Sequence, residues 1–190
     1  MGMPGTASPG RWTREMVFAL PDDDNRYELF DGELLVTPAP GGLHQLALKR
    51  LYDVVAPFVE ANRLGAMLWS PADLRLGGEQ LSQPDLFVVP FLPADRNDWA
   101  LYPDPILVVE VISAGTARFD RIVKRRRFQQ AGIQEYWIVD LEARVLERWT
   151  PEDERPEILD RVLRWHPEGA AVPLELSLPP FFTAIWGKEP

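Results

Sequence analysis

The sequence predicts an α/β (α+β) fold in which a mixed β-sheet is flanked by helices, with an N-terminal helix and hairpin as an extension. Three observations support this class. From residue 44 onward the patterns follow the order helix, strand, strand, strand, helix, strand, with a further strand after it. Residues 107–112, "LVVEVI", are apolar on both faces apart from Glu110, as in a central strand that is covered on both sides. A helical segment then leads to the strand "EYWIVD", which favours a right-handed parallel connection.

The composition limits the classes to which the chain can belong. With 190 residues and 46% apolar side chains, we expect a single domain over residues 1–190, with a disordered Gly/Pro-rich segment at residues 1–10. The absence of cysteine excludes disulfides, thiolate metal sites and a cysteine nucleophile, and fits a reducing cytoplasm. No apolar run reaches the roughly 18 residues that a membrane span needs. The net charge of −9 argues against a broad basic face for nucleic acid but leaves room for a local basic site.

The N-terminal third is predicted to contain a helix, a hairpin and a second helix. Thr13 is a suitable N-cap for a short helix over "TREMVFAL" that ends at Pro21. The segments "RYELF" and "ELLVT" flank Asp31-Gly32, a favoured two-residue hairpin turn. Apolar residues recur at near-helical spacing over residues 43–65, where Pro57 is expected to kink the helix before it ends at a glycine.

The rest of the chain is predicted to supply the sheet. The segments "AMLWSPADLRLGG" and "PDLFVVP" indicate two strands, and a proline-rich loop (residues 90–105) leads to residues 107–112. "TARFDRIVKRRRFQQAG" indicates a helix closed by Gly132. After it, "EYWIVD" and "RVLERWT" are expected to form a hairpin through Leu141–Ala143. Residues 151–190 contain prolines and short apolar stretches, and we assign no element there.

Two carboxylates interrupt the apolar strands. Asp85 opens the strand "PDLFVVP", and Glu110 lies in the middle of residues 107–112. Burying an ionised carboxylate without a partner is costly, and facing Cβ atoms on neighbouring strands would lie about 5 Å apart. A divalent cation removes the repulsion between two such groups, and Mg²⁺ prefers oxygen ligands, so both residues are candidate metal ligands. Two other interpretations stay open: Asp85 as a strand-entry residue, and Glu110 in a buried ion pair with an arginine of the following helix.

The predicted helix after Glu110 is rich in cations. Asp120 and Lys124 are four residues apart, so they share a face, and the long side chain of Lys124 could reach the two carboxylates. The run is also typical of a solvated basic helix surface. Its cationic residues are Arg118, Arg121, Lys124, Arg125, Arg126 and Arg127.

These motifs resemble, in order and over most of the chain, the large bacterial family of "putative restriction endonucleases" of the PD-(D/E)xK nuclease superfamily. The most specific features are the Pro84-Asp85 pair, the strand that ends in "EVIS", the spacing of Asp120 and Lys124, and "GIQEYWIVD". The matching segments are "RYELFDGEL", "LHQLALKRL", "SPADLRL", "QPDLFVV", "LVVEVIS" and "TARFDRIVKRRRFQQAGIQEYWIVD".

The resemblance implies a restriction-endonuclease-like core over residues 44–140 and a role for each candidate residue. Asp85 and Glu110 would be catalytic carboxylates that bind Mg²⁺, or Mn²⁺, and a lysine would orient the attacking water. The superfamily usually places that lysine two residues after the second acid, where this chain has Ile112. Lys124 is the expected replacement, because the two other lysines lie far from the motif in the sequence.

The sequence leaves two functions open. The first is a Mg²⁺-dependent endonuclease that acts on DNA, with the arginines beside Lys124 on the phosphate backbone and a homodimeric assembly suited to cutting both strands. The second is a catalytically inactive relative that uses the fold to bind nucleic acid or a protein partner, which the charge of −9 and the lysine missing from position 112 favour. Glu28 and His44 fall on family-like positions and are candidate neighbours of the site.

Overall fold

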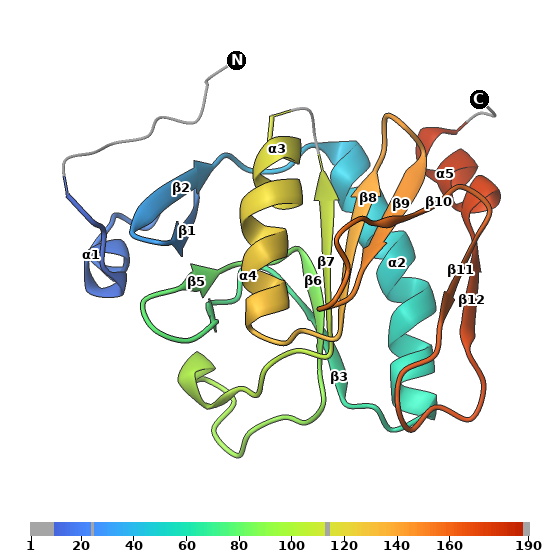
Figure 1. Cartoon of the computed structure of the whole chain (residues 1–190), viewed down its shortest axis with the longest axis horizontal. Coiled ribbons are helices and arrows are strands. Elements are labelled where there is room, and N and C mark those ends of the chain that lie inside the picture. Colours follow the sequence, from blue (N-terminus) through green and yellow to red (C-terminus); the bar gives the residue numbers. More distant parts are fainter. Residues whose placement is uncertain (1–9, 24, 113–114, 188–190) are drawn as a thin grey trace.

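A six-stranded mixed sheet forms the centre of the protein, whose computed structural model describes residues 10–23, 25–112 and 115–187 (Figure 1). The strand order is β10-β9-β8-β7-β6-β3, and only β7 and β8 are parallel, as the sequence predicts. The strands are β3 (Ala66–Trp69), β6 (Leu86–Val89), β7 (Leu107–Ile112), β8 (Glu135–Asp140), β9 (Val145–Trp149) and β10 (Glu157–Leu159).

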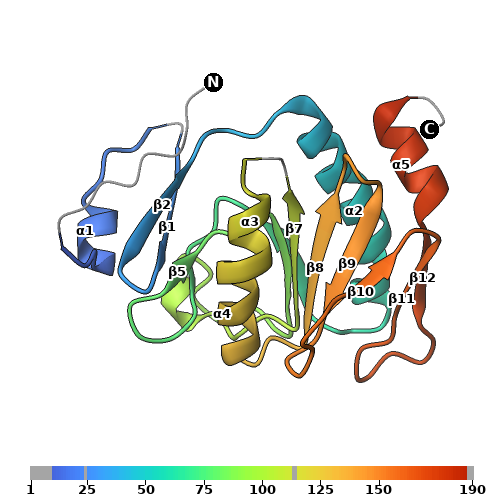
Figure 2. The ribbon, with the colours of Figure 1, turned by 45° about the horizontal axis from the view of Figure 1, so that its top comes forward.

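Helices cover both faces of this sheet (Figure 2). On one face α2 (Gly42–Ala61) and α5 (Leu178–Trp186) share an apolar core with Val109 of β7. On the other face Phe128 packs with Val108 of β7. Because successive residues of a strand point to opposite faces, both sides of β7 are buried, and this explains its nearly continuous apolar sequence.

The hairpin of the N-terminal extension forms a second sheet together with two short strands from the segment between β3 and β6. Helix α1 (Arg14–Phe18) begins after Thr13, whose hydroxyl accepts a hydrogen bond from the Met16 N–H as an N-cap does. Strands β1 and β2 form the predicted hairpin, whose turn at Asp31-Gly32 has positive φ at both residues, as a type I′ turn requires. The sheet has the order β2-β1-β5-β4, with β1 (Arg26–Phe30), β2 (Glu33–Thr37), β4 (Leu74–Arg75) and β5 (Leu81–Ser82).

Two predicted elements are wrong in detail. "AMLWSPADLRLGG" is not one strand, because β3 and β4 belong to different sheets, and Pro71 between them has no N–H to continue a ladder. The helix after β7 is interrupted: α3 (Ala117–Phe119) is followed by the π-helical segment η2 (Asp120–Lys124) and by α4 (Arg125–Gln130). In η2 the N–H of Arg125 donates to the carbonyl of Asp120, five residues earlier.

The C-terminal region, which the sequence left unassigned, extends the core. A two-stranded ribbon, β11 (Val162–Trp165) and β12 (Leu174–Ser177), precedes α5 and contributes Leu163 and Trp165 to the core beneath α2. A short 3₁₀ helix, η1 (Trp99–Leu101), lies in the proline-rich loop. Of the predicted disordered segment at residues 1–10 only the last residue is described. None of the helices in the described ranges combines the length and the apolar character that a membrane crossing demands.

Gly65 fixes the connection between α2 and β3. Its φ is +125°, and a Cβ atom there would lie 1.8 Å from the carbonyl oxygen of Val89. We expect Gly65→Ala to lower the free energy of unfolding by about 3 kcal/mol or more, measured by urea denaturation. Gly77→Ala is the matched control, because Gly77 also has positive φ but faces open space, so its cost should be about 1 kcal/mol. Equal losses in the two variants would contradict the close backbone approach.

Candidate functional site

Asp85 lies directly before β6 and beside Glu110. The register pairs Leu86 with Val109, so its continuation by one residue places Asp85 opposite Glu110. One carboxylate oxygen of Asp85 lies 2.8 Å from Arg26 Nη1. The other accepts hydrogen bonds from the Val111 N–H at 2.8 Å and from His44 Nε2 at 2.9 Å. Asp85 is therefore fixed by three separate chain segments rather than solvated as a strand-entry residue would be.

These contacts keep Asp85 ionised although it is only 2% exposed. Burial alone would raise its pKa, but the hydrogen bond and charge of His44, the charge of Arg26 and the Val111 N–H together hold the pKa of Asp85 well below its ordinary value of 3.8. Asp85 is thus a fixed anion at neutral pH.

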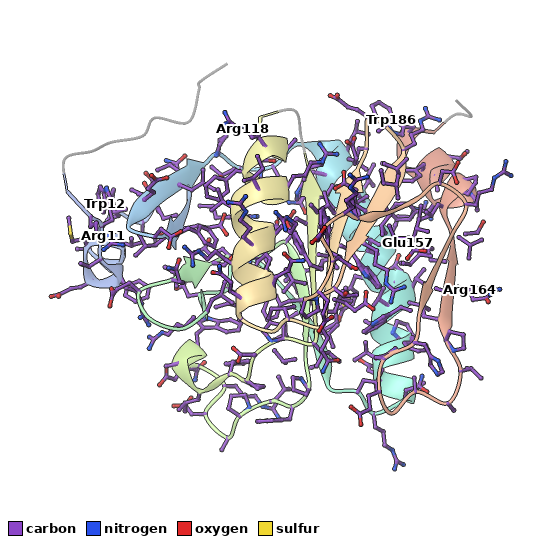
Figure 3. The ribbon with its side chains drawn as sticks, in the orientation of Figure 1. Arg11, Trp12, Arg118, Glu157, Arg164 and Trp186 are labelled. Atoms are coloured by element: carbon purple, nitrogen blue, oxygen red, sulfur yellow. The ribbon has the colours of Figure 1, made fainter. Side chains whose placement is uncertain are left out.

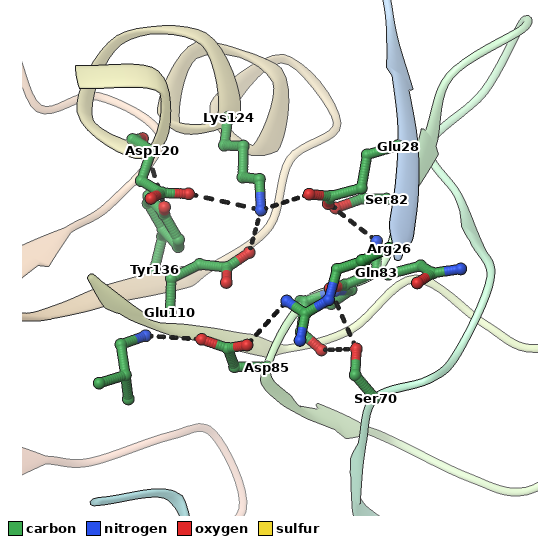
Figure 4. A network of polar contacts seen from close by, with 12 residues as sticks. Arg26, Glu28, Ser70, Ser82, Gln83, Asp85, Glu110, Asp120, Lys124 and Tyr136 are labelled. Atoms are coloured by element: carbon green, nitrogen blue, oxygen red, sulfur yellow. Dashed lines mark hydrogen bonds and ion pairs between the residues drawn. The ribbon is translucent and has the colours of Figure 1, made fainter. Parts of the chain in front are cut away.

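Lys124 lies at the centre of a group of carboxylates (Figure 4). Its Nζ atom is 2.9 Å from Glu110 Oε1, 2.8 Å from Glu28 Oε2 and 3.4 Å from Asp120 Oδ1. The residue is only 3% exposed. Burial opposes its charge, but the attraction of Glu110, Glu28 and Asp120 outweighs burial and raises the pKa of Lys124 well above 10.5. Lys124 is therefore an ammonium ion inside the protein.

Glu28 reaches this group from the second sheet. Its Oε1 atom accepts hydrogen bonds from the hydroxyl of Ser82 and the N–H of Gln83, both at 2.9 Å. Its other oxygen faces Lys124, so the side chain bridges β5 and η2. The hairpin β1–β2 is consequently a part of the site and not merely an appendage.

Asp120 is held from the opposite side by the π-helical segment. The backbone carbonyl of Asp120 accepts a hydrogen bond from the Tyr136 hydroxyl at 3.3 Å, in addition to the N–H of Arg125. Burial raises the pKa of Asp120, and Lys124 opposes this effect. Such segments are frequent at functional sites, and this one directs Lys124 toward Glu110 of β7 and places Asp120 beside Lys124.

The cluster contains more acid than base. We define the carboxylate cluster as the four buried acids, each at most 3% exposed, that surround the two permanent cations Arg26 and Lys124. Four carboxylates share these two cations, so the acids outnumber the permanent positive charges of the cluster. The acids are Glu28, Asp85, Glu110 and Asp120.

The negative charges of the cluster affect the pKa of Glu110. Its burial, together with the nearby negative charges, raises the pKa of Glu110 well above 4.5, against the opposing attraction of Lys124. The folded protein therefore binds a proton at Glu110 at a pH where the unfolded chain has released it.

This raised pKa has a measurable effect on stability. The folded state binds more protons than the unfolded state above pH 4.5, so wild type should lose stability relative to Glu110→Gln as the pH rises from about 4.5 toward 8. Urea unfolding of both proteins across this range in EDTA gives the difference between their free energies of unfolding. Groups elsewhere titrate in the same way in both proteins, so their contributions cancel in this difference. A difference that is constant with pH would contradict the raised pKa of Glu110.

The structure brings together all of the residues that the sequence singled out as candidates or neighbours of a site. Asp85, Glu110 and Lys124 lie in one cluster with Glu28 and His44. The alternative that Glu110 pairs with an arginine of the following helix is wrong, because its partner from that helix is Lys124. The geometry does not by itself assign a role to any of these residues.

The arginines beside Lys124 are largely engaged within the protein. Arg121 pairs with Asp140 and Glu147, Arg127 pairs with Asp31, and the Arg125 guanidinium lies 4.7 Å from the ring centroid of Trp149. Arg118 and Arg126 are exposed, and Arg118 lies at the outer end of α3 (Figure 3). The interpretation of a solvated basic helix surface therefore holds for Arg118 and Arg126 and is wrong for Lys124, which is buried.

The cation that the sequence analysis missed is Arg26. It lies two residues before Glu28 on β1, so both side chains point to the same face of the hairpin. One signal in the sequence could have pointed to this strand: Glu28 interrupts the strand "RYELF" as Glu110 interrupts β7.

The mixed sheet between helical layers, with its acids and lysine gathered where β6 begins and β7 ends, defines a protein of the restriction-endonuclease-like class. The sequence profile of the Uma2 family, described as "Putative restriction endonuclease", matches residues 14–184, and the chain belongs to this family. Among solved structures, a "putative nuclease belonging to DUF820" from Anabaena variabilis ATCC 29413 has a similar fold, with a TM-score of 0.72. Its sequence is 19% identical, and the match covers 91% of this chain and 98% of that chain. No curated protein matches the chain.

Proposed function

We propose that the protein is a nuclease that hydrolyses phosphodiester bonds of DNA with the help of Mg²⁺ or Mn²⁺. The observation that carries the proposal is the excess of buried acids over permanent cations in the carboxylate cluster, next to a buried lysine. A divalent cation would favour the ionised form of these carboxylates. Membership of the Uma2 family supports the same activity.

The donor atoms of the cluster fit a hard cation. Asp85 and Glu110 offer carboxylate oxygens from neighbouring strands, and the chain has no cysteine. Within residues 10–23, 25–112 and 115–187, no group of three or more His, Cys, Asp or Glu side chains could hold a metal by itself. Mg²⁺ usually takes one or two carboxylates and keeps several waters, so this pair is a sufficient protein contribution.

The cluster would then divide the work of hydrolysis among its residues. A bound cation would lower the pKa of water and neutralise charge on the phosphate. Asp85 is held in one orientation by His44 and the Val111 N–H, so its geometry does not depend on the substrate. The ammonium of Lys124, beside Glu110, would orient the attacking water and stabilise charge that develops on the phosphate. Arg26, whose side chain is 18% exposed, would bind a phosphate oxygen from the outer side.

The test is cleavage of supercoiled plasmid and of single-stranded DNA by the purified protein. We expect products with Mg²⁺ or Mn²⁺ and none with EDTA. Absence of cleavage with both metals on both substrates would contradict the proposal. Sedimentation of the same preparation, alone and with DNA, tests the predicted homodimer.

A second candidate function is supported by the internal neutralisation of the site. Arg26 and His44 already occupy Asp85, and Lys124 is almost inaccessible, so the fold can hold these acids without a metal. With the net charge of −9, this favours a non-catalytic module that binds nucleic acid or a protein partner. That function predicts that the protein does not cleave DNA. It also predicts that Mg²⁺ changes the free energy of unfolding of wild type no more than that of Asp85→Ala.

A further inference from the structure

The two oxygens of the Asp85 carboxylate have different partners. Oδ2 accepts hydrogen bonds from the Val111 N–H and from His44 Nε2, and these bonds fix the orientation of the carboxylate. An ionised carboxylate has about two lone-pair sites on each oxygen, so Oδ2 is fully used. Oδ1 contacts Nη1 of Arg26 at 2.8 Å (Figure 4). Oδ1 is therefore the oxygen through which Asp85 could bind a metal, and the guanidinium of Arg26 lies against it.

Arg26 is the more accessible of the two permanent cations of the carboxylate cluster. Its side chain is 18% exposed, whereas that of Lys124 is 4% exposed and contacts three acids. Arg26 is also the first residue of β1, and its backbone pairs with Thr37 of β2. The guanidinium can turn toward water by rotation of the long side chain alone, while this backbone pair stays in place. A divalent cation would therefore displace Arg26 more easily than Lys124.

The charge of Arg26 depends on the acids that a metal would bind. Burial opposes this charge, but the attraction of the nearby carboxylates, of which Asp85 is the strongest, outweighs burial and raises the pKa of Arg26 above its ordinary value. The other two carboxylates are Glu110 and Glu28. A divalent cation beside Asp85 and Glu110 would cancel this attraction and repel the guanidinium at short range. The two positive groups are therefore not stable at the same oxygen.

We infer that Arg26 and a divalent cation compete for Oδ1 of Asp85, so that Arg26 controls the metal affinity of the site. The inference rests on the proposed metal-dependent nuclease and adds the regulation of its metal binding. Without DNA, Arg26 stays on Asp85 and weakens the binding of Mg²⁺. A DNA phosphate offers the displaced guanidinium a new partner, because arginine is well suited to phosphate oxygens. Metal and DNA therefore strengthen each other's binding, as linkage requires.

The test is isothermal titration calorimetry of Mn²⁺ into the protein without DNA. We expect Arg26→Met to lower the Kd for Mn²⁺ by about tenfold or more, because the neutral side chain no longer competes for Oδ1. Arg26→Lys, which keeps a cation at this position, should stay within about threefold of wild type. Arg127→Met is the matched control, since it removes the same charge from a contact between the hairpin and α4 outside the carboxylate cluster. Its Kd should lie within about twofold of wild type.

A second measurement uses wild type itself and does not depend on the folding of Arg26→Met. The Nε–H resonance of Arg26 in the ¹H–¹⁵N spectrum is identified as the one that Arg26→Lys lacks. Addition of Mg²⁺ should shift this resonance, because the guanidinium leaves Asp85. A resonance that stays in place while Mg²⁺ shifts the backbone N–H of Val111, the neighbour of Glu110, would overturn the inference.

The outcomes separate this inference from the nuclease proposal. If Arg26→Met binds Mn²⁺ more tightly than wild type but wild type cleaves no DNA, the nuclease proposal fails and the competition stands. If wild type cleaves DNA while Arg26→Met has an unchanged or higher Kd for Mn²⁺, the competition is refuted and the nuclease proposal stands. Equal gains in Arg26→Met and Arg127→Met would reflect net charge alone and would also refute the competition, as would the absence of Mn²⁺ binding in every variant.

Discussion

Glu110→Gln is expected to reduce Mg²⁺-dependent DNA cleavage by about 10³-fold or more, because it removes one of the two proposed metal carboxylates while keeping the side-chain volume. The same substitution should leave the free energy of unfolding in EDTA within about 1 kcal/mol of wild type, or raise it. Lys124 keeps Glu28 at 2.8 Å and Asp120 at 3.4 Å, so no cation is left unpaired. The variant also removes the acid whose ionisation the fold opposes.

The measurement combines plasmid cleavage with urea denaturation, and Glu147→Gln is the control. Glu147 is a buried carboxylate on β9 that pairs with Arg121, outside the carboxylate cluster. This control should cleave DNA at nearly the wild-type rate. A purely structural role for Glu110 would give the reverse result: no specific loss of cleavage, and a fall in stability of about 3–5 kcal/mol from breaking a buried pair.

Lys124→Met should be the most destabilising single change in the site, with a loss of about 3–5 kcal/mol at pH 8 in EDTA. The raised pKa of Lys124 means that its ammonium stabilises the fold at every pH below about 10.5, so the full effect is present at pH 8. Without it, Glu28, Glu110 and Asp120 have lost their common cation. Lowering the pH to about 5 should recover much of the lost stability, since the carboxylates can then be neutralised by protons.

Lys49→Met is the matched control for this experiment. Lys49 and Asp53 form an i,i+4 pair, like Asp120 and Lys124, but their side chains are 69% and 51% exposed. A surface pair of this kind contributes less than about 1 kcal/mol, so this variant should unfold almost as wild type does. Urea denaturation of both variants at pH 8 and pH 5 measures the loss of free energy of unfolding that each substitution causes. Similar losses for the two lysines, or a loss for Lys124→Met that does not depend on pH, would show that the cluster does not concentrate charge as the geometry indicates.

Stability and activity are expected to respond differently within the cluster. Arg26 and Lys124 are the cations that hold the acids together, so their removal should weaken the fold. Glu110 adds to the excess of acids over cations, so its removal should affect chemistry before stability. A metal ion that binds the cluster should stabilise wild type, and Asp85→Asn or Glu110→Gln should weaken this effect.

The sequence determined the elements whose signals are local. Thr13 at the start of α1 and Asp31-Gly32 in the hairpin are dictated by caps and turns, which depend on a few adjacent residues. The apolar pattern of β7 identified the centre of the sheet, and the acid that breaks it, Glu110, marked the site. The order of helix and strand patterns was enough to indicate the parallel pairing of β7 and β8.

Only the tertiary structure decided how the charges are balanced. Arg26 and Glu28 belong to a different sheet from Asp85 and Glu110, and no local pattern shows that a hairpin near the N-terminus closes over the start of β6. The π-helical segment at Asp120 was invisible for a related reason, because helix periodicity does not distinguish one wider turn. Burial and pairing depend on contacts between residues far apart in the chain, and they set the pKa of each group. The sequence therefore named the acids and the lysine, while the packing of distant segments determined which of them stay charged and which cations they contact.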